Sequence, residues 1–222
     1  MFKGLTKPER VRTFWVLGCM GLSILVLAVD ANLGESLITA EIWGYGFSAF
    51  FLALAFVLND QLLKKLFLFA ILAGFFELPA DHYLVGVTKT LVYPQNQAMI
   101  WSSPLYMPFS WSVVLVEFGY VSWFLLKKLK PVAAGLLLAF LGACLVPLYE
   151  YWAISAGWWH YENTKLWGSV PFYIIIAEGL LMIPVPYFIS KLEESSLFKV
   201  AFFALLEGLV MLIACLIAIQ LV

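Results

Sequence analysis

The sequence predicts an all-α, polytopic membrane protein with a single domain, residues 1–222, built from seven transmembrane helices. The first observation behind this prediction is composition: 64% of the residues are hydrophobic and 12% are charged. Soluble domains are about 45–50% apolar and about 25% charged, so water is not the main solvent of this chain. The second observation is that apolar runs of the length needed to cross a bilayer recur along the whole sequence.

The apolar runs are uninterrupted rather than alternating, which favours helices over strands. We expect helices at approximately 12–30, 38–58, 62–81, 105–126, 132–155, 170–189 and 198–220. The first run follows a basic tail, as in a signal peptide, but six further runs indicate a retained first span. The second and third runs are joined by Asn59-Asp60-Gln61, which is long enough only for a hairpin turn.

Basic residues set the expected orientation. All Lys and Arg residues except Lys89 and Lys165 lie in the N-terminal tail, which includes Lys3, or at the connections after the second, fourth and sixth spans. The positive-inside rule therefore places the N-terminus inside and the C-terminus outside. The longer loops, roughly 82–104 and 156–169, then face the non-cytoplasmic side and mark the working face. We expect a bacterial inner (plasma) membrane or the endoplasmic reticulum.

Carboxylates within the spans are the candidate catalytic groups. The spans contain Glu77, Glu117, Glu150, Glu178 and Glu207, with Asp81 at a boundary. Away from the span ends there is no Lys or Arg to pair with them, so burial favours their neutral, proton-donating form. From the helical rise we expect Glu77, Glu150 and Glu178 to share one depth, with Glu207 separate. We predict catalytic roles for Glu77, Asp81, Glu150 and Glu178; the alternative for each is an interhelical hydrogen bond.

Aromatic and polar side chains around these acids, with Glu117 nearer the midplane, are the candidate substrate-binding groups. They are His82, Tyr106, Trp111, Glu117, Tyr149, Trp152, Trp158, Trp159, His160 and Tyr173. Aromatic faces stabilise a cation, and a neutral acid above an aromatic cavity is what protonation of an alkene or epoxide requires. We expect Asp81 and His82 to tune or relay the proton. The alternative for the aromatic residues is interface anchoring and core packing.

Three segments resemble small membrane enzymes of isoprenoid metabolism. They are Pro147-Leu148-Tyr149-Glu150-Tyr151-Trp152, Gly157-Trp158-Trp159-His160-Tyr161, and Val170-Pro171-Phe172-Tyr173 followed by Glu178. The similarity is to the integral-membrane terpene cyclases, the heterodimeric-type lycopene cyclases and the carotenoid hydratases. The Pro-x-Glu-Glu pattern of the lycopene cyclases is absent. The resemblance to the terpene cyclases implies metal-free protonation by a carboxylic acid at Glu77 or Glu150.

The sequence therefore predicts acid-catalysed cyclisation or hydration of an isoprenoid or other membrane lipid, without a metal or cofactor. The net charge of -1 indicates no nucleic-acid partner, and the oligomeric state stays open. One alternative is a proton-coupled transporter that uses the same acids as a relay. A second is a metal-dependent lipid hydrolase, although zinc amidases of the alkaline ceramidase type would use three histidines and this chain has two. A third is a non-catalytic lipid-binding scaffold.

Overall fold

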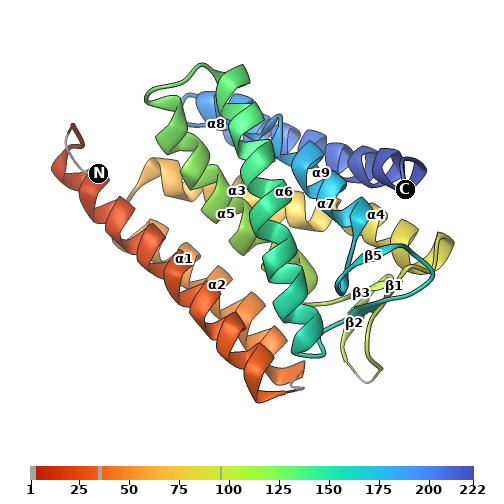
Figure 1. The fold of residues 1–222 in the computed structure, drawn as a ribbon. Coiled ribbons are helices and arrows are strands. Elements are labelled where there is room, and N and C mark those ends of the chain that lie inside the picture. Colours follow the sequence, from red (N-terminus) through yellow and green to blue (C-terminus); the bar gives the residue numbers. More distant parts are fainter. Residues whose placement is uncertain (1–3, 35–36, 96) are drawn as a thin grey trace.

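Helices make up most of the computed structural model, which describes residues 4–34, 37–95 and 97–222; Lys3 lies outside these ranges (Figure 1). The helices are α1 (Lys7–Leu33), α2 (Leu37–Val57), α3 (Gln61–Phe76), α4 (Leu78–His82), α5 (Met107–Leu126), α6 (Pro131–Ser155), α7 (Phe172–Met182), α8 (Val185–Leu192) and α9 (Leu197–Gln220). The predicted all-α class is confirmed.

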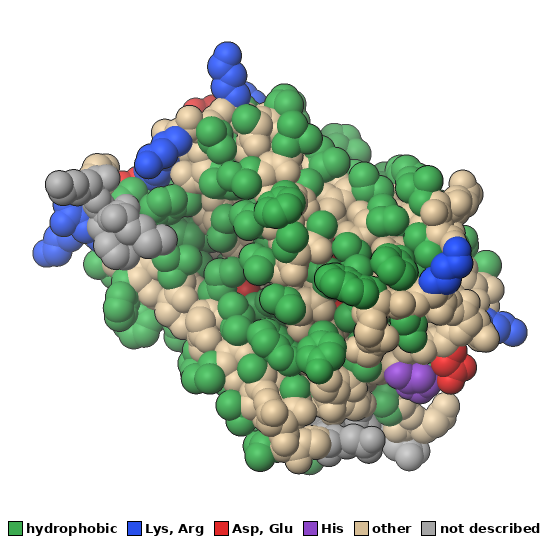
Figure 2. Space-filling view, in the orientation of Figure 1, with side chains coloured by type: hydrophobic (Ala, Val, Ile, Leu, Met, Phe, Trp, Pro, Cys, Tyr) green, Lys and Arg blue, Asp and Glu red, His purple; other side chains and the backbone are tan. Residues whose placement is uncertain are grey.

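Among the residues that the structure describes, six stretches are long and apolar enough to cross a membrane. They are α1, residues 38–57 of α2, α5, α6, the α7–α8 stretch Phe172–Leu192, and α9. Large apolar side chains point outward from them, as at Phe140, which is 64% exposed, and Phe198, which is 85% exposed. Figure 2 shows hydrophobic side chains over the middle of one face, with Lys and Arg towards its margins. The molecule thus has the surface of a membrane protein.

The third predicted span is divided, so the prediction of an unbroken helix over 62–81 was wrong. Helix α3 ends at Phe76, α4 begins at Leu78, and a π-helical turn, η1 (Tyr83–Val87), follows directly. The physical reason is Pro79, which has no backbone N–H and whose ring clashes with the carbonyl group four residues earlier. The break leaves Glu77 at the junction of the two helices, with its N–H donating to Ala73 O at 2.9 Å.

The two longer loops contain short strands that the sequence did not predict. Strand β1 (Leu91–Val92) pairs with β4 (His160–Tyr161), β2 (Met99–Ile100) with β3 (Ser103–Pro104), and β5 (Leu166–Trp167) with β6 (Val170–Pro171), all antiparallel. The β1–β4 pair joins the two loops to each other. In Figure 1 the labelled strands lie together at one end of the bundle, which we call the loop end.

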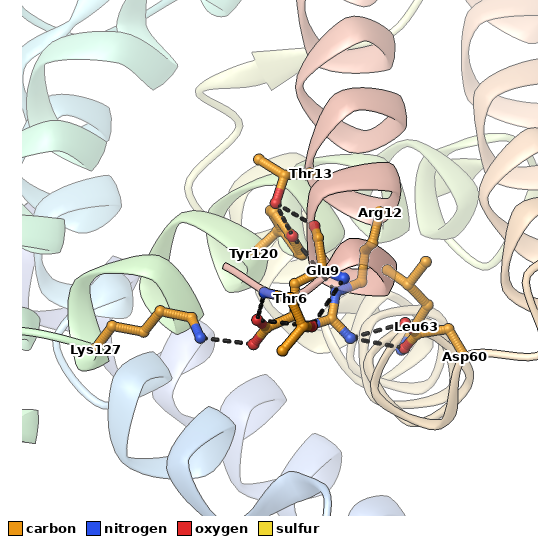
Figure 3. A network of polar contacts seen from close by, with 8 residues as sticks. All are labelled: Thr6, Glu9, Arg12, Thr13, Asp60, Leu63, Tyr120 and Lys127. Carbon is orange, nitrogen blue, oxygen red and sulfur yellow. Dashed lines mark hydrogen bonds and ion pairs between the residues drawn. The ribbon is translucent and has the colours of Figure 1, made fainter. Parts of the chain in front are cut away.

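The opposite end, which we call the basic end, gathers the start of α1 and three connections. Lys127, after α5, contacts Glu9 at 2.7 Å, and Arg12 contacts Asp60, between α2 and α3, at 2.8 Å (Figure 3). Lys65 donates to the carbonyl of Glu193, between α8 and α9. The connections predicted to share the side of the N-terminus therefore do lie at one end of the bundle.

Close helix packing positions the break in the third predicted span. A Cβ atom added at Gly74 of α3 would lie 2.3 Å from Pro108 O of α5, and one added at Gly208 of α9 would lie 2.4 Å from Phe76 Cβ. Small residues let membrane helices approach backbone to backbone. The glycines therefore hold the end of α3, and Glu77 with it, against α5 and α9.

The Arg12–Asp60 pair gives a first testable prediction. Arg12 Nη1 donates to both carboxylate oxygens of Asp60, at 2.9 Å to Oδ1 and 2.8 Å to Oδ2. Asp60 also caps α3, because its Oδ1 accepts a hydrogen bond from Leu63 N at 3.0 Å. Asp60→Asn keeps a cap and removes the charge, so we expect a loss of about 2 kcal/mol in unfolding free energy. Asp60→Ala loses the cap as well, about 1 kcal/mol more.

Denaturant unfolding in detergent micelles measures both variants. The control is Glu9→Gln, because Glu9 and Lys127 form an exposed pair that we expect to contribute less than about 1 kcal/mol. Wild-type stability in Asp60→Ala would show that the buried pair does not hold α1 to the bundle.

Candidate functional site: an acid-lined cavity

A cavity of about 100 Å³ lies beneath the loop end, between helices α1, α2, α4, α5, α6, α7 and α9. Four carboxyl side chains line it: Glu77, Asp81, Glu150 and Glu178. Seven aromatic side chains share the wall: Trp43, Tyr93, Trp111, Tyr149, Trp158, Trp159 and Tyr161. We call this space the acid cavity.

The acid cavity has no cationic wall among the residues that the structure describes: its lining includes no Lys, Arg or His. Four ionised carboxylates in such surroundings would be strongly unfavourable, because neither water nor a counter-charge compensates for their desolvation. The cavity therefore favours carboxyl groups that retain protons.

Asp81 and Glu150 each accept two hydrogen bonds on a single oxygen. Asp81 Oδ2 accepts from the hydroxyl of Tyr93 at 2.8 Å and from that of Ser103. Glu150 Oε2 accepts from Trp159 Nε1 at 2.9 Å and from the Tyr161 hydroxyl at 2.7 Å. Such donors stabilise a carboxylate, which is the product formed when a carboxylic acid gives up its proton.

Glu77 and Glu178 have the opposite environment. The Oε2 atom of each is buried, and the described part of the chain offers it no hydrogen-bond partner. An unpaired buried charge is costlier than an unpaired neutral group, so this environment favours the protonated form. The acid cavity thus combines two acids with stabilised carboxylates and two acids without donors.

The paired loops explain how the donors reach the acids. Tyr93 follows β1 directly and Tyr161 lies in β4, so the β1–β4 ladder brings both tyrosines over the cavity from the loop end. Burial, together with the charges of Asp81 and Glu77, raises the pKa of Tyr93 well above its ordinary value. Burial and the charge of Glu150 likewise raise the pKa of Tyr161. Both phenols therefore keep their protons and remain donors.

Eight predicted site residues line the acid cavity. They are Glu77, Asp81, Trp111, Tyr149, Glu150, Trp158, Trp159 and Glu178. The expected convergence of Glu77, Glu150 and Glu178 is therefore present in the structure. Glu207, predicted to be separate, is absent from the described lining, and both of its carboxyl oxygens are buried without a partner among the described residues.

Six predicted residues do not line it: His82, Tyr106, Glu117, Trp152, His160 and Tyr173. His82 stacks on Trp101, with ring centroids 4.2 Å apart. His160 is exposed beside Glu162, so neither histidine lies in the cavity wall. The structure thus gives His82 no direct place in the predicted relay.

Glu117 forms interhelical hydrogen bonds, which was the structural alternative for the buried acids. Its carboxyl oxygens accept from Ser23 Oγ at 2.8 Å and from the Tyr149 hydroxyl at 3.0 Å, which satisfies it away from the cavity. The hydroxyl of Tyr173 contacts that of Thr90 at 3.0 Å instead of facing the cavity.

Trp43, Tyr93 and Ser103 carried no signal in the sequence, and Tyr161 was not among the predicted site residues. Tyr161 stands in one of the resembling segments, two residues after Trp159, and could have been included on that ground. Tyr93 and Ser103 lie in a loop whose path carries no periodic signal, so only the fold shows that both reach Asp81. Within the described residues, no group of three or more His, Cys, Asp or Glu could hold a metal ion.

The fold and the cavity define the class: an all-α membrane protein with a carboxyl-lined, aromatic-walled cavity at one end of its bundle. The chain belongs to the family described as "Domain of unknown function (DUF6989)", whose model matches residues 78–222. That stretch includes Asp81, Glu150 and Glu178, and Glu77 immediately precedes it. Comparisons with curated proteins and with solved structures give no match.

Proposed function

We propose that this protein is an integral-membrane enzyme that uses the acid cavity for acid-catalysed cyclisation or hydration of an isoprenoid or other lipid. One observation carries the proposal: four carboxyl groups line the same cavity as seven aromatic rings, with no cationic side chain in the described part of its wall. Proton donation and shelter of the resulting carbocation need these two features in one place.

Asp81 fits the role of proton donor best. In the reaction its O–H bond breaks, and the π electrons of a substrate alkene form a new C–H bond, leaving a carbocation; an epoxide would take the proton on oxygen. The hydroxyls of Tyr93 and Ser103 stabilise the Asp81 carboxylate that results. Glu77, four residues before Asp81 and on the same cavity wall, is the carboxyl group from which the donor can regain its proton.

Two endings balance the reaction. In cyclisation, a second alkene of the substrate attacks the cation, and a carboxylate then removes a proton; in hydration, water attacks and loses one. Glu150 fits this accepting role, because Trp159 and Tyr161 already hold its carboxyl oxygen. The surrounding rings stabilise the cation by about 0.5–2 kcal/mol per face.

The proposal includes seven crossings, with the N-terminus inside and the C-terminus outside. Helices α3 and α4 together run from Gln61 to His82. They form the third crossing along the chain and, added to the six long apolar stretches, bring the number to seven. Contacts at the basic end support this topology, because Lys65, Lys127 and Arg12 all lie there. The acid cavity then faces the non-cytoplasmic half of a bacterial inner membrane or of the endoplasmic reticulum.

Incubation of the purified protein with geranylgeraniol or its terminal epoxide in D₂O tests the reaction. We expect a cyclised or hydrated product; from the alkene it should carry one deuterium on the carbon that accepted the proton, as mass spectrometry would show. If neither compound gives a product and proteoliposomes show proton-coupled flux of a solute, the protein is a transporter and not an enzyme.

A further inference from the structure

We propose that a groove between α1 and α2 holds the hydrocarbon tail of the substrate while its reacting end occupies the acid cavity. This inference rests on the proposed function and adds the route and the size of the substrate. The groove is an apolar space of about 520 Å³. We call it the tail groove.

The tail groove faces the bilayer. All of its lining residues belong to α1 or α2, and both helices are long and apolar enough to cross a membrane. None of the described lining residues is charged, and its walls include Phe14, Leu22 and Phe50. An uncharged chain can therefore pass from the lipid into the groove without losing any hydrogen bond.

Two glycines keep the groove open. A Cβ atom added at Gly18 of α1 or at Gly46 of α2 would meet nothing within 4 Å, although both residues line the groove. They differ from Gly74, where the added atom would collide with a neighbouring helix. At Gly18 and Gly46 the missing side chain leaves room instead of allowing close helix packing.

Trp43 lines both the tail groove and the acid cavity. Its Nε1 donates to Ser23 O at 3.1 Å, and its ring lies 6.0 Å from Tyr149 and 6.1 Å from Trp158, centroid to centroid. Both of these rings belong to the acid cavity wall. A chain lying in the groove is therefore one side chain, Trp43, away from the acid cavity.

The two volumes indicate the length of the substrate. The acid cavity, at about 100 Å³, offers about seven to ten water-sized sites, enough for about one or two isoprene units. The remainder of a longer chain needs a second apolar space, and the tail groove borders the cavity. The structure thus points to a substrate longer than two isoprene units, with no charge along its tail.

Photocrosslinking tests the groove without requiring turnover. The probe is geranylgeraniol with a diazirine in the middle of its chain, added to the protein in phosphatidylcholine vesicles. We expect labelled peptides from α1 and α2, and competition by excess geranylgeraniol but not by more phosphatidylcholine. Gly46→Phe should abolish the labelling, and Gly21→Phe should keep it, because Gly21 is equally open but does not line the groove.

Unchanged labelling in Gly46→Phe, labelling elsewhere, or competition by phosphatidylcholine alone would overturn the inference. So would a change of oligomeric state in Gly46→Phe, which would assign the groove to a second copy of the chain. If turnover is found, Gly46→Phe should raise KM for geranylgeraniol about tenfold and leave KM for geraniol, which has two isoprene units, unchanged. Turnover in which Gly46→Phe changes neither KM would contradict the role of the tail groove, but it would not contradict the proposed function.

Discussion

Asp81→Asn is expected to lower turnover by about 10³-fold, which is the loss typical of a missing general acid. The amide is nearly isosteric and still accepts hydrogen bonds from Tyr93 and Ser103, so the local structure should persist. What it lacks is a proton acidic enough to reach an alkene. Initial rates of product formation at saturating substrate, measured by gas chromatography, give the comparison.

The matched control for Asp81→Asn is Glu207→Gln. Glu207 is another buried carboxyl group, on α9, but it does not line the acid cavity, so its amide should retain wild-type turnover. Equal losses in the two variants would mean that buried carboxyl groups support folding in general. Full activity in Asp81→Asn would remove Asp81 from the mechanism.

The donors to Asp81 should show a graded effect in the same assay. Tyr93→Phe and Ser103→Ala each remove one hydrogen bond to the carboxylate that forms, worth about 1.5 kcal/mol, or about tenfold in rate. A structural role would lower the amount of folded protein instead and leave kcat unchanged, so kcat per folded molecule distinguishes the two explanations.

Gly74→Leu is expected to prevent recovery of folded protein, the largest stability effect that we predict. An added Cβ would lie 2.3 Å from Pro108 O and 3.2 Å from Pro108 Cα, so the backbones of α3 and α5 would have to separate. No flexible side chain can yield at this contact. We expect Gly74→Ala alone to cost about 4 kcal/mol, at the upper end for overpacking.

Gly21→Leu is the control, because an added Cβ there meets nothing within 4 Å. It should elute from size exclusion as wild type and unfold at a similar denaturant concentration. A monodisperse, stable Gly74→Leu protein would contradict the packing of α3 against α5, and with it the position of Glu77 at the cavity.

Much of the candidate site could be predicted because helical spacing is local. The rise per residue indicated that Glu77, Glu150 and Glu178 lie at one depth, and all three line the acid cavity. The histidines show the limit of that reasoning. His82 and His160 stand near the acids in sequence, but stacking on Trp101 and the position of β4 keep both outside the cavity wall.

The sequence by itself determined the membrane class, the approximate helix positions and which connections share an end, because apolar runs and Lys or Arg counts are local properties. It did not determine the division at Glu77 or the pairing of β1 with β4. The division depends on how Pro79 interrupts the helix. The strand pairing depends on contacts between residues about seventy positions apart. Only the tertiary structure decided that Tyr93 and Tyr161 hold Asp81 and Glu150, because loop paths follow from packing and not from periodicity.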